Sequence, residues 1–189
     1  MNEHPRRQRL THDGMRRLTY AALYLAIAMV LPFATGQIPR IGAMLCPMHI
    51  PVLLCGFMCG WKWGLAVGFV APLLRSVLFG MPPMFPRAVA MAFELAVYGG
   101  TAGILYSILP RRTVSVYVTL LTAMILGRVV WGTVRMILAG VQGSSFTWKM
   151  FMAGAFTDAV PGIVLHIILI PILVIVLEKA GLSLNGRKE

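Results

Sequence analysis

Long apolar runs, separated by short turns, fill most of this sequence and decide which solvent the chain can fold in. Of its 189 residues, 58% are hydrophobic and only 12% are charged, whereas a soluble domain carries about 25% charged residues. A helix that crosses a bilayer needs about 20 mostly apolar residues. About six such helices would use nearly all of the chain between Arg17 and Lys179. The sequence therefore predicts an all-α integral membrane protein with no room for a soluble catalytic domain.

Prolines, glycines and charged residues divide the chain into spans and tails. A basic tail is expected over residues 1–17, one membrane domain over residues 18–179 and a second tail over residues 180–189. The predicted spans are Leu18–Phe33, Pro47–Gly60, Gly64–Phe79, Ala88–Leu109, Val114–Val141 and Phe151–Leu177. The second of them is short for a crossing helix. The sequence GMPPMFP at residues 80–86 predicts a loop, because proline lacks the amide donor that a helix requires.

Lysine and arginine are distributed unevenly between the two sides that these spans define. If the amino terminus lies inside, eleven of them fall on the inner side, and three fall on the outer side: Arg40, Arg87 and Lys149. Basic residues gather in the cytoplasmic loops and tails of membrane proteins. Both termini are therefore predicted to be cytoplasmic. The net charge of +11 is then explained by anionic lipid rather than by nucleic acid.

Five charged residues fall within the predicted spans, where a charge costs at least about 2.5 kcal/mol at the bilayer centre. They are Arg75, Glu94, Arg128, Arg135 and Asp158. The direction of each span and the helical rise of about 1.5 Å per residue place all five in the outer half of the membrane. Charged residues at such depths face protein or a water-filled cavity. Together they predict a binding cavity on the outer side.

The fifth span presents a face suited to an anionic ligand with an apolar body. Arg128, Trp131 and Arg135 are spaced so that they share one side of a helix, with two guanidinium groups around an indole. Three buried arginines against two carboxylates leave one positive charge over, which favours a ligand with one net negative charge. In the competing interpretation, Arg75 and Arg128 only pair with Glu94 and Asp158, while Arg135 extends to the membrane interface.

Histidines and cysteines add one candidate contact and no metal site. His49 stands at the outer start of the second span and is a candidate ligand contact, although a hydrogen-bonded loop histidine is the alternative. His166 lies deep in the sixth span, where a neutral hydrogen bond between helices is expected. Cys46, Cys55 and Cys59 have no partner set at zinc spacing, so free thiols are expected, and neither a metal nor a cofactor is predicted.

Small residues at helical spacing predict close helix contacts. Ala22 and Ala26 form such a pair on the first helix, and glycines recur every four residues from Gly56 to Gly68. Packing within the chain is the default explanation for both. The sequence contains no phosphate-binding GxxxxGK[ST] loop. If the chain takes part in an ATP-driven process, the ATPase must therefore be a different polypeptide.

Three segments resemble one family of membrane proteins. They are the basic tail leading into an alanine-rich first helix, the block HIPVLLCGFMCGWKWGLAVGFVAPLLRSVLFGMPPMFP at residues 49–86, and MAFELAVYGG at residues 91–100. The chain resembles, over nearly its whole length, the substrate-binding S components of energy-coupling factor (ECF) vitamin transporters. The resemblance implies a six-helix subunit of the bacterial plasma membrane that captures a vitamin from outside. It also implies a complex with a transmembrane coupling protein and two ATPase subunits.

The resemblance gives roles to individual residues. The family's AxxxA motif, which contacts the coupling protein, corresponds to Ala22 and Ala26. Ligand in the family sits in the outer half, in agreement with the five charges found there, and the loop at residues 80–86 becomes a candidate lid. The expected ligand is a small anionic vitamin, with pantothenate first because it joins a carboxylate to a compact polar body. Riboflavin and folate stay open.

Two other classes of function stay open from the residues. One is a small membrane enzyme that acts on lipid or peptide with Glu94, Asp158 and His166. However, His166 is expected about 12 Å farther along its helix than Asp158, which is poor geometry for a shared reacting atom. The other is a structural membrane subunit in which the charges form internal salt bridges.

Overall fold

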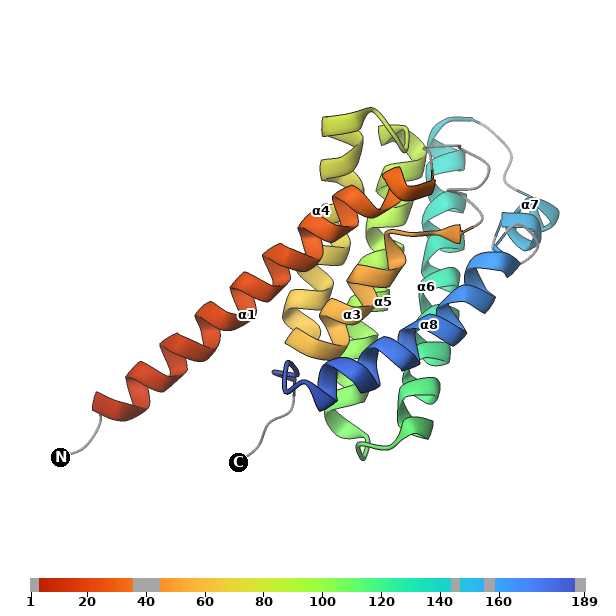
Figure 1. Ribbon diagram of the computed structural model, residues 1–189. Helices are drawn as coiled ribbons and strands as arrows, with labels where there is room; N and C mark the ends of the chain where they lie inside the picture. Colours follow the sequence, from red (N-terminus) through yellow and green to blue (C-terminus); the bar gives the residue numbers. More distant parts are fainter. Residues whose placement is uncertain (1–3, 36–44, 144–146, 155–158, 186–189) are drawn as a thin grey trace.

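The computed structural model shows a bundle of helices (Figure 1) and describes residues 4–35, 45–143, 147–154 and 159–185. All regular structure in these ranges is helical. The elements are α1 (His4–Val30), η1 (Leu31–Thr35), α3 (His49–Cys59), α4 (Trp61–Phe79), η2 (Met84–Ala88), α5 (Val89–Ile108), α6 (Thr113–Val141), α7 (Trp148–Met152) and α8 (Val160–Lys179). The predicted all-α fold is confirmed.

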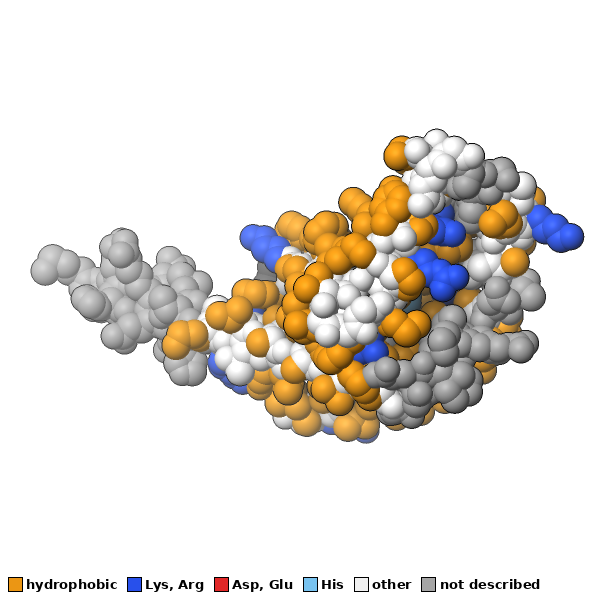
Figure 2. Space-filling view, turned by 90° about the horizontal axis from the view of Figure 1, so that it is seen from above, with side chains coloured by type: hydrophobic (Ala, Val, Ile, Leu, Met, Phe, Trp, Pro, Cys, Tyr) orange, Lys and Arg blue, Asp and Glu red, His pale blue; other side chains and the backbone are white. Residues whose placement is uncertain are grey.

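Among the described residues, five helical segments are long and apolar enough to cross a membrane. They are Asp13–Phe33, Trp61–Phe79, Met84–Ile108, Thr113–Val141 and Val160–Lys179. The outside of the bundle exposes many large apolar side chains, and hydrophobic atoms cover much of the surface in Figure 2. Such a surface matches lipid as its solvent. With the short apolar helix α3, these segments are compatible with the predicted six spans.

Helix α3 is short and lies inside the bundle. Every one of its residues is buried, because it packs against α1, α4, α5 and α8. A helix that is apolar on all sides is typical of such an enclosed position. Gly60 joins α3 directly to α4 with φ +94°, a backbone conformation that glycine adopts without steric strain.

Helices α4 and α5 approach each other closely through glycines. A methyl group at Gly68 would overlap the Leu95 carbonyl oxygen, and one at Gly99 would overlap the Gly64 carbonyl oxygen. Only residues without a side chain permit this approach of two backbones. The helix packing predicted from the glycine repeat is confirmed here.

The predicted sixth span, Phe151–Leu177, is wrong at its start. The structure has a separate short helix α7 (Trp148–Met152), and α8 begins only at Val160. Pro161 stands in the first turn of α8, where the amide hydrogen that proline lacks has no partner in the helix. At the other end of the chain, α1 begins at His4, within the predicted basic tail.

The helices alternate in direction, so that α1 begins and α8 ends toward the end of the bundle that holds the α5–α6 turn (Figure 1). This arrangement is compatible with both termini on one side of a membrane. We call this end the inner end and the opposite one the outer end, following the predicted orientation.

The chain that follows α8 packs back onto the inner end of the bundle. Asn185 Nδ2 donates hydrogen bonds to Gly56 O at 3.4 Å and Gly103 O at 3.0 Å, and Leu184 N donates to Met58 O at 2.7 Å. Ser183, Leu184 and Asn185 are each 5% exposed. This segment, predicted as part of a tail, therefore belongs to the packed body.

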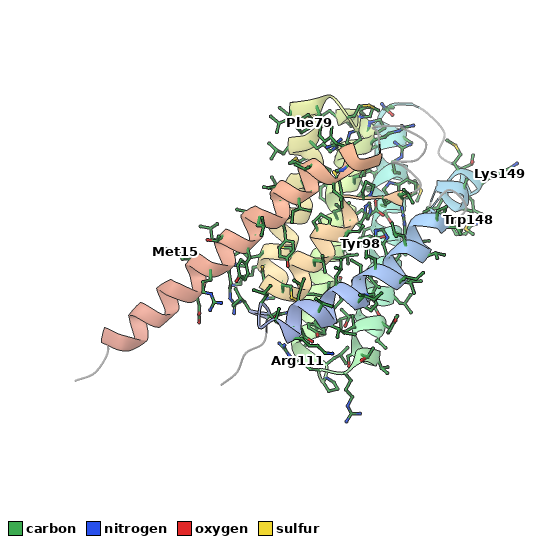
Figure 3. All side chains as sticks on the ribbon, in the orientation of Figure 1. Met15, Phe79, Tyr98, Arg111, Trp148 and Lys149 are labelled. Carbon is green, nitrogen blue, oxygen red and sulfur yellow. The ribbon has the colours of Figure 1, made fainter. Side chains whose placement is uncertain are left out.

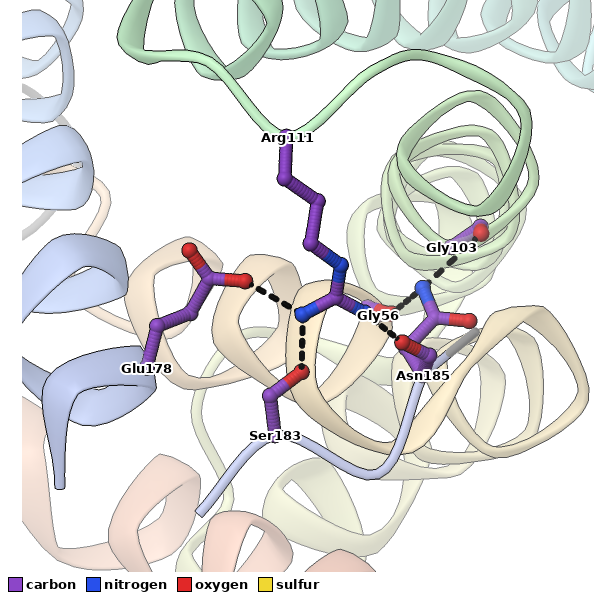
Figure 4. A network of polar contacts seen from close by, with 6 residues as sticks. All are labelled: Gly56, Gly103, Arg111, Glu178, Ser183 and Asn185. Atoms are coloured by element: carbon purple, nitrogen blue, oxygen red, sulfur yellow. Dashed lines mark hydrogen bonds and ion pairs between the residues drawn. The ribbon is translucent and has the colours of Figure 1, made fainter. Parts of the chain in front are cut away.

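Two arginines fasten that segment to the helices around it. Arg111 Nη1 donates to Glu178 Oε1 at 2.6 Å and to Ser183 Oγ at 3.4 Å, and Arg111 Nη2 donates to Asn185 O (Figure 4). From α1, Arg17 donates to Leu184 O at 2.7 Å and to Cys59 O at 3.5 Å. We call this set the tail network. Its members are Arg17, Arg111, Glu178, Ser183, Leu184 and Asn185.

Candidate ligand-binding site

Five polar side chains from four helices meet inside the bundle. We call them the polar core cluster: His49 of α3, Glu94 and Tyr98 of α5, Arg128 of α6 and His166 of α8. His49, Glu94, Tyr98 and His166 are 1–3% exposed. Figure 3 places Tyr98 in the interior, between Phe79 at one end of the bundle and Arg111 at the other. Polar groups buried to this degree normally have hydrogen-bond partners.

An ion pair forms the charged side of the cluster. Arg128 Nη1 lies 3.0 Å from Glu94 Oε1, and Arg128 Nη2 donates to Cys46 Sγ at 3.9 Å. Burial raises the pKa of the Cys46 thiol above its usual range, so the thiol remains neutral. The two opposite charges compensate each other, and removing either would leave a buried charge without its counterion.

Two imidazoles and a phenol form the other side of the cluster. The His49 ring lies 5.2 Å from the Tyr98 ring and 5.8 Å from the His166 ring, between centroids. His49 Nε2 is 3.7 Å from Glu94 Oε1, and His166 is hydrogen-bonded to the Cys46 backbone. His166 thus belongs to the cluster, although its predicted depth along the sixth span suggested a separate position.

Several polar atoms of the cluster make no hydrogen bond within the part of the chain that the structure describes. They are both ring nitrogens of His49, Nε2 of His166, Oη of Tyr98 and Nε of Arg128. Tyr98 lies beside Glu94, but the two groups lack the geometry of a hydrogen bond. Each unbonded buried group costs about 1–3 kcal/mol of stability. Their convergence on one place marks a site suited to a polar ligand.

Arg75, predicted as a ligand contact, links two helices near the outer end. It is 5% exposed, and its Nη1 donates to Met29 O of α1 at 2.5 Å. Its guanidinium carbon lies 5.0 Å from the Phe33 ring and 5.2 Å from the Phe79 ring. These cation–π contacts stabilise the buried guanidinium charge. The described contacts of Arg75 join α4 to α1 rather than to the polar core cluster.

Trp131 and Arg135 lie farther toward the outer end of α6. The Trp131 ring is 6.3 Å from the Phe151 ring of α7, and Gly154 packs against the same indole. The charge of Arg135 interacts with that of Arg87. Figure 2 views this end and shows Lys and Arg side chains but no Asp or Glu among its described residues. Asp158, the remaining predicted contact, lies outside the described residues.

Of the residues predicted to surround a ligand, the structure brings three together. They are Glu94 and Arg128, which are charged residues within apolar runs, and His49, the candidate contact at the start of the second span. The structure adds Tyr98 and His166. Tyr98 follows Glu94 by four residues, which places both on one helix face. This spacing was a sequence signal for Tyr98.

The small-residue pair of the first helix faces outward. Ala22 and Ala26 are exposed, whereas Ala21 and Ala28 are buried against the bundle. Leu23 beside them is 56% exposed. Ala22 and Ala26 thus make a flat apolar strip on the outside of α1, and internal packing does not account for them.

The apolar exterior, the five candidate spans and the buried polar site define a multi-pass membrane protein with a polar site in its interior. The family model for the ECF transporter, substrate-specific component, matches residues 16–174, and the chain belongs to this family. The resemblance seen in the sequence is thereby confirmed. No curated protein and no solved structure is significantly similar to the chain.

Membership fixes the general role of the chain. Substrate-specific components of ECF transporters are transport subunits rather than enzymes. They bind a small-molecule substrate and associate with a transporter module of membrane and ATPase subunits. The chain is therefore a substrate-specific transport subunit of the vitamin type.

Proposed function

We propose that this subunit captures pantothenate at the outer side of a bacterial plasma membrane. The observation that carries the proposal is the polar core cluster, in which several buried polar atoms lack hydrogen-bond partners among the described residues. A purely structural subunit gains nothing from such groups, because each lowers its stability. A bound solute would supply the missing partners.

The charges at the outer end favour an anionic substrate. Arg87, Arg135 and Lys149 are basic residues described there, and positive fields raise the rate at which anions arrive. Pantothenate has one carboxylate, an amide and two hydroxyl groups, so it combines a negative charge with several hydrogen-bonding groups. Riboflavin and folate are the alternatives within the same class of substrate.

The substrate is tested first by releasing and identifying any small molecule that survives purification in detergent, using native mass spectrometry. Pantothenate affinity is then measured for Arg135→Gln, with Arg112→Gln at the inner end as the matched control. We expect Arg135→Gln to weaken binding at least about tenfold, since hydrogen bonds to charged groups contribute about 1.5–3 kcal/mol. Unchanged affinity in a folded Arg135→Gln protein would count against Arg135 as the carboxylate contact, and absence of pantothenate binding in the wild type would count against pantothenate.

The exposed alanine pair suggests where the partner binds. We propose that Ala22 and Ala26 contact the transmembrane coupling protein, which works with two ATPase subunits. Replacing both by leucine should abolish copurification of those subunits while leaving vitamin binding intact, because large side chains prevent close helix approach. Ala66→Leu on the exposed face of α4 is the control. Retained copurification in the double variant would contradict this contact.

A further inference from the structure

The permanent charges of the polar core cluster are already paired with each other within the protein. Arg128 and Glu94 compensate each other at 3.0 Å. The other members, His49, Tyr98 and His166, offer groups that both donate and accept, since a neutral imidazole has one nitrogen of each kind and a phenol does both. A charged ligand group placed among them would be buried without a counterion, which is strongly unfavourable.

We infer that the polar core cluster binds an uncharged part of the ligand that both donates and accepts hydrogen bonds, such as an amide or a hydroxyl group. Any carboxylate of the ligand stays near Arg135, which is seven residues from Arg128 and thus about 10 Å farther toward the outer end. This inference rests on the proposed capture function. It adds unmet hydrogen-bonding capacity to positive charge as a basis of ligand recognition.

Tyr98 is the residue that tests this inference most directly, because its hydroxyl can be removed without changing the shape of the ring. The chain also provides a matched control. Tyr106 lies on the same helix, is 2% exposed against 1% for Tyr98, and its hydroxyl likewise makes no hydrogen bond of normal geometry within the described chain. Tyr106, however, lies beside Arg111 and Glu178 at the inner end, two helical turns from the polar core cluster.

The experiment compares Tyr98→Phe with Tyr106→Phe in the full-length protein. Dissociation constants are measured for pantothenate and for pantothenol, in which a hydroxymethyl group replaces the carboxylate, with riboflavin and folate completing the panel. We expect Tyr98→Phe to weaken every vitamin that binds the wild type by about tenfold, including both pantothenate and pantothenol. Tyr106→Phe should weaken none of them. Arg135→Gln should weaken pantothenate but leave pantothenol unchanged.

The outcomes separate this inference from the proposed function. If the wild type binds none of the four compounds, the proposed capture of these vitamins fails and the inference fails with it. If the wild type binds but Tyr98→Phe binds equally well, only the inference fails. Loss of pantothenate binding alone in Tyr98→Phe would also overturn it, because the carboxylate would then lie at Tyr98. The melting temperatures of both tyrosine variants are also measured without ligand. Values at or above that of the wild type verify that a loss of affinity is not caused by unfolding.

Discussion

The polar core cluster and the tail network are two polar regions that contact α5 at different depths, through Glu94 and Tyr98 in the first case and through Gly103 in the second. In the tail network, the Asn185 amide donates to Gly56 O and Gly103 O, and Arg111 bonds groups from both α8 and the segment behind it. In the polar core cluster, the His49 and Tyr98 side chains have no hydrogen bond among the described residues.

Under our proposal, this difference separates polar groups that stabilise the fold from polar groups that bind a ligand. A buried group that is hydrogen-bonded contributes about 0.5–1.5 kcal/mol, whereas an unbonded one destabilises by about 1–3 kcal/mol. The tail network should therefore control stability with little effect on binding. The polar core cluster should control binding, with the exception of its ion pair.

The ion pair should give the largest effect on stability. Arg128→Ala leaves Glu94 buried beside an empty place, and we expect the free energy of unfolding to fall by about 3–5 kcal/mol. Denaturant unfolding in detergent measures it. The double variant Arg128→Met with Glu94→Leu should recover most of that loss, since both charges are then gone. If Arg128→Ala unfolds like the wild type, the pair is not the buried contact described above.

The close contact of α4 and α5 sets both regions in place, so a disturbance there should damage each of them. Gly99→Ala drives a methyl group into the Gly64 carbonyl, and we expect a loss of about 3 kcal/mol from overpacking. The neighbouring Gly100→Ala meets only the Leu65 side chain, no nearer than 3.6 Å, and should melt close to the wild-type temperature. Equal melting of the two variants would refute the close backbone approach.

Asn185→Ala should reduce stability without reducing vitamin affinity. It leaves the carbonyl groups of Gly56 and Gly103 without this donor, at an expected loss of about 2 kcal/mol. Thermal unfolding and the dissociation constant are measured on the same preparation. A large loss of affinity with unchanged melting would reverse the division of roles between the two regions.

The smallest effect is expected at the rim of the tail network. Glu178→Gln removes the ion pair with Arg111. In the wild type, the Arg111 side chain is 39% exposed and the Glu178 side chain is 23% exposed. Exposed pairs contribute about 0–1 kcal/mol, and salt screens them. Raising the salt concentration should therefore bring the melting temperatures of the wild type and of Glu178→Gln together. A gap that persists in high salt would show that Glu178 does not act through a screened ion pair.

The sequence predicted the helical fold and three members of the polar core cluster, His49, Glu94 and Arg128, for a physical reason. Charges such as Glu94 and Arg128 are conspicuous in apolar runs, because lipid tolerates them only when they are enclosed. Tyr98 carries no charge and did not stand out. The partners of Arg75 and of Asn185 are residues far away in the sequence, so no local sequence pattern could predict these contacts.

Helix α1 is fastened at two points, near its middle and near its outer end. Arg17 holds its middle part to Cys59 and Leu184, and Arg75 holds its outer part through the Met29 carbonyl. The exposed alanines lie between these two attachments. A partner bound to this stretch would therefore contact a part of α1 that is attached to the bundle on both sides. A force on the stretch would move the whole bundle rather than separate α1 from it.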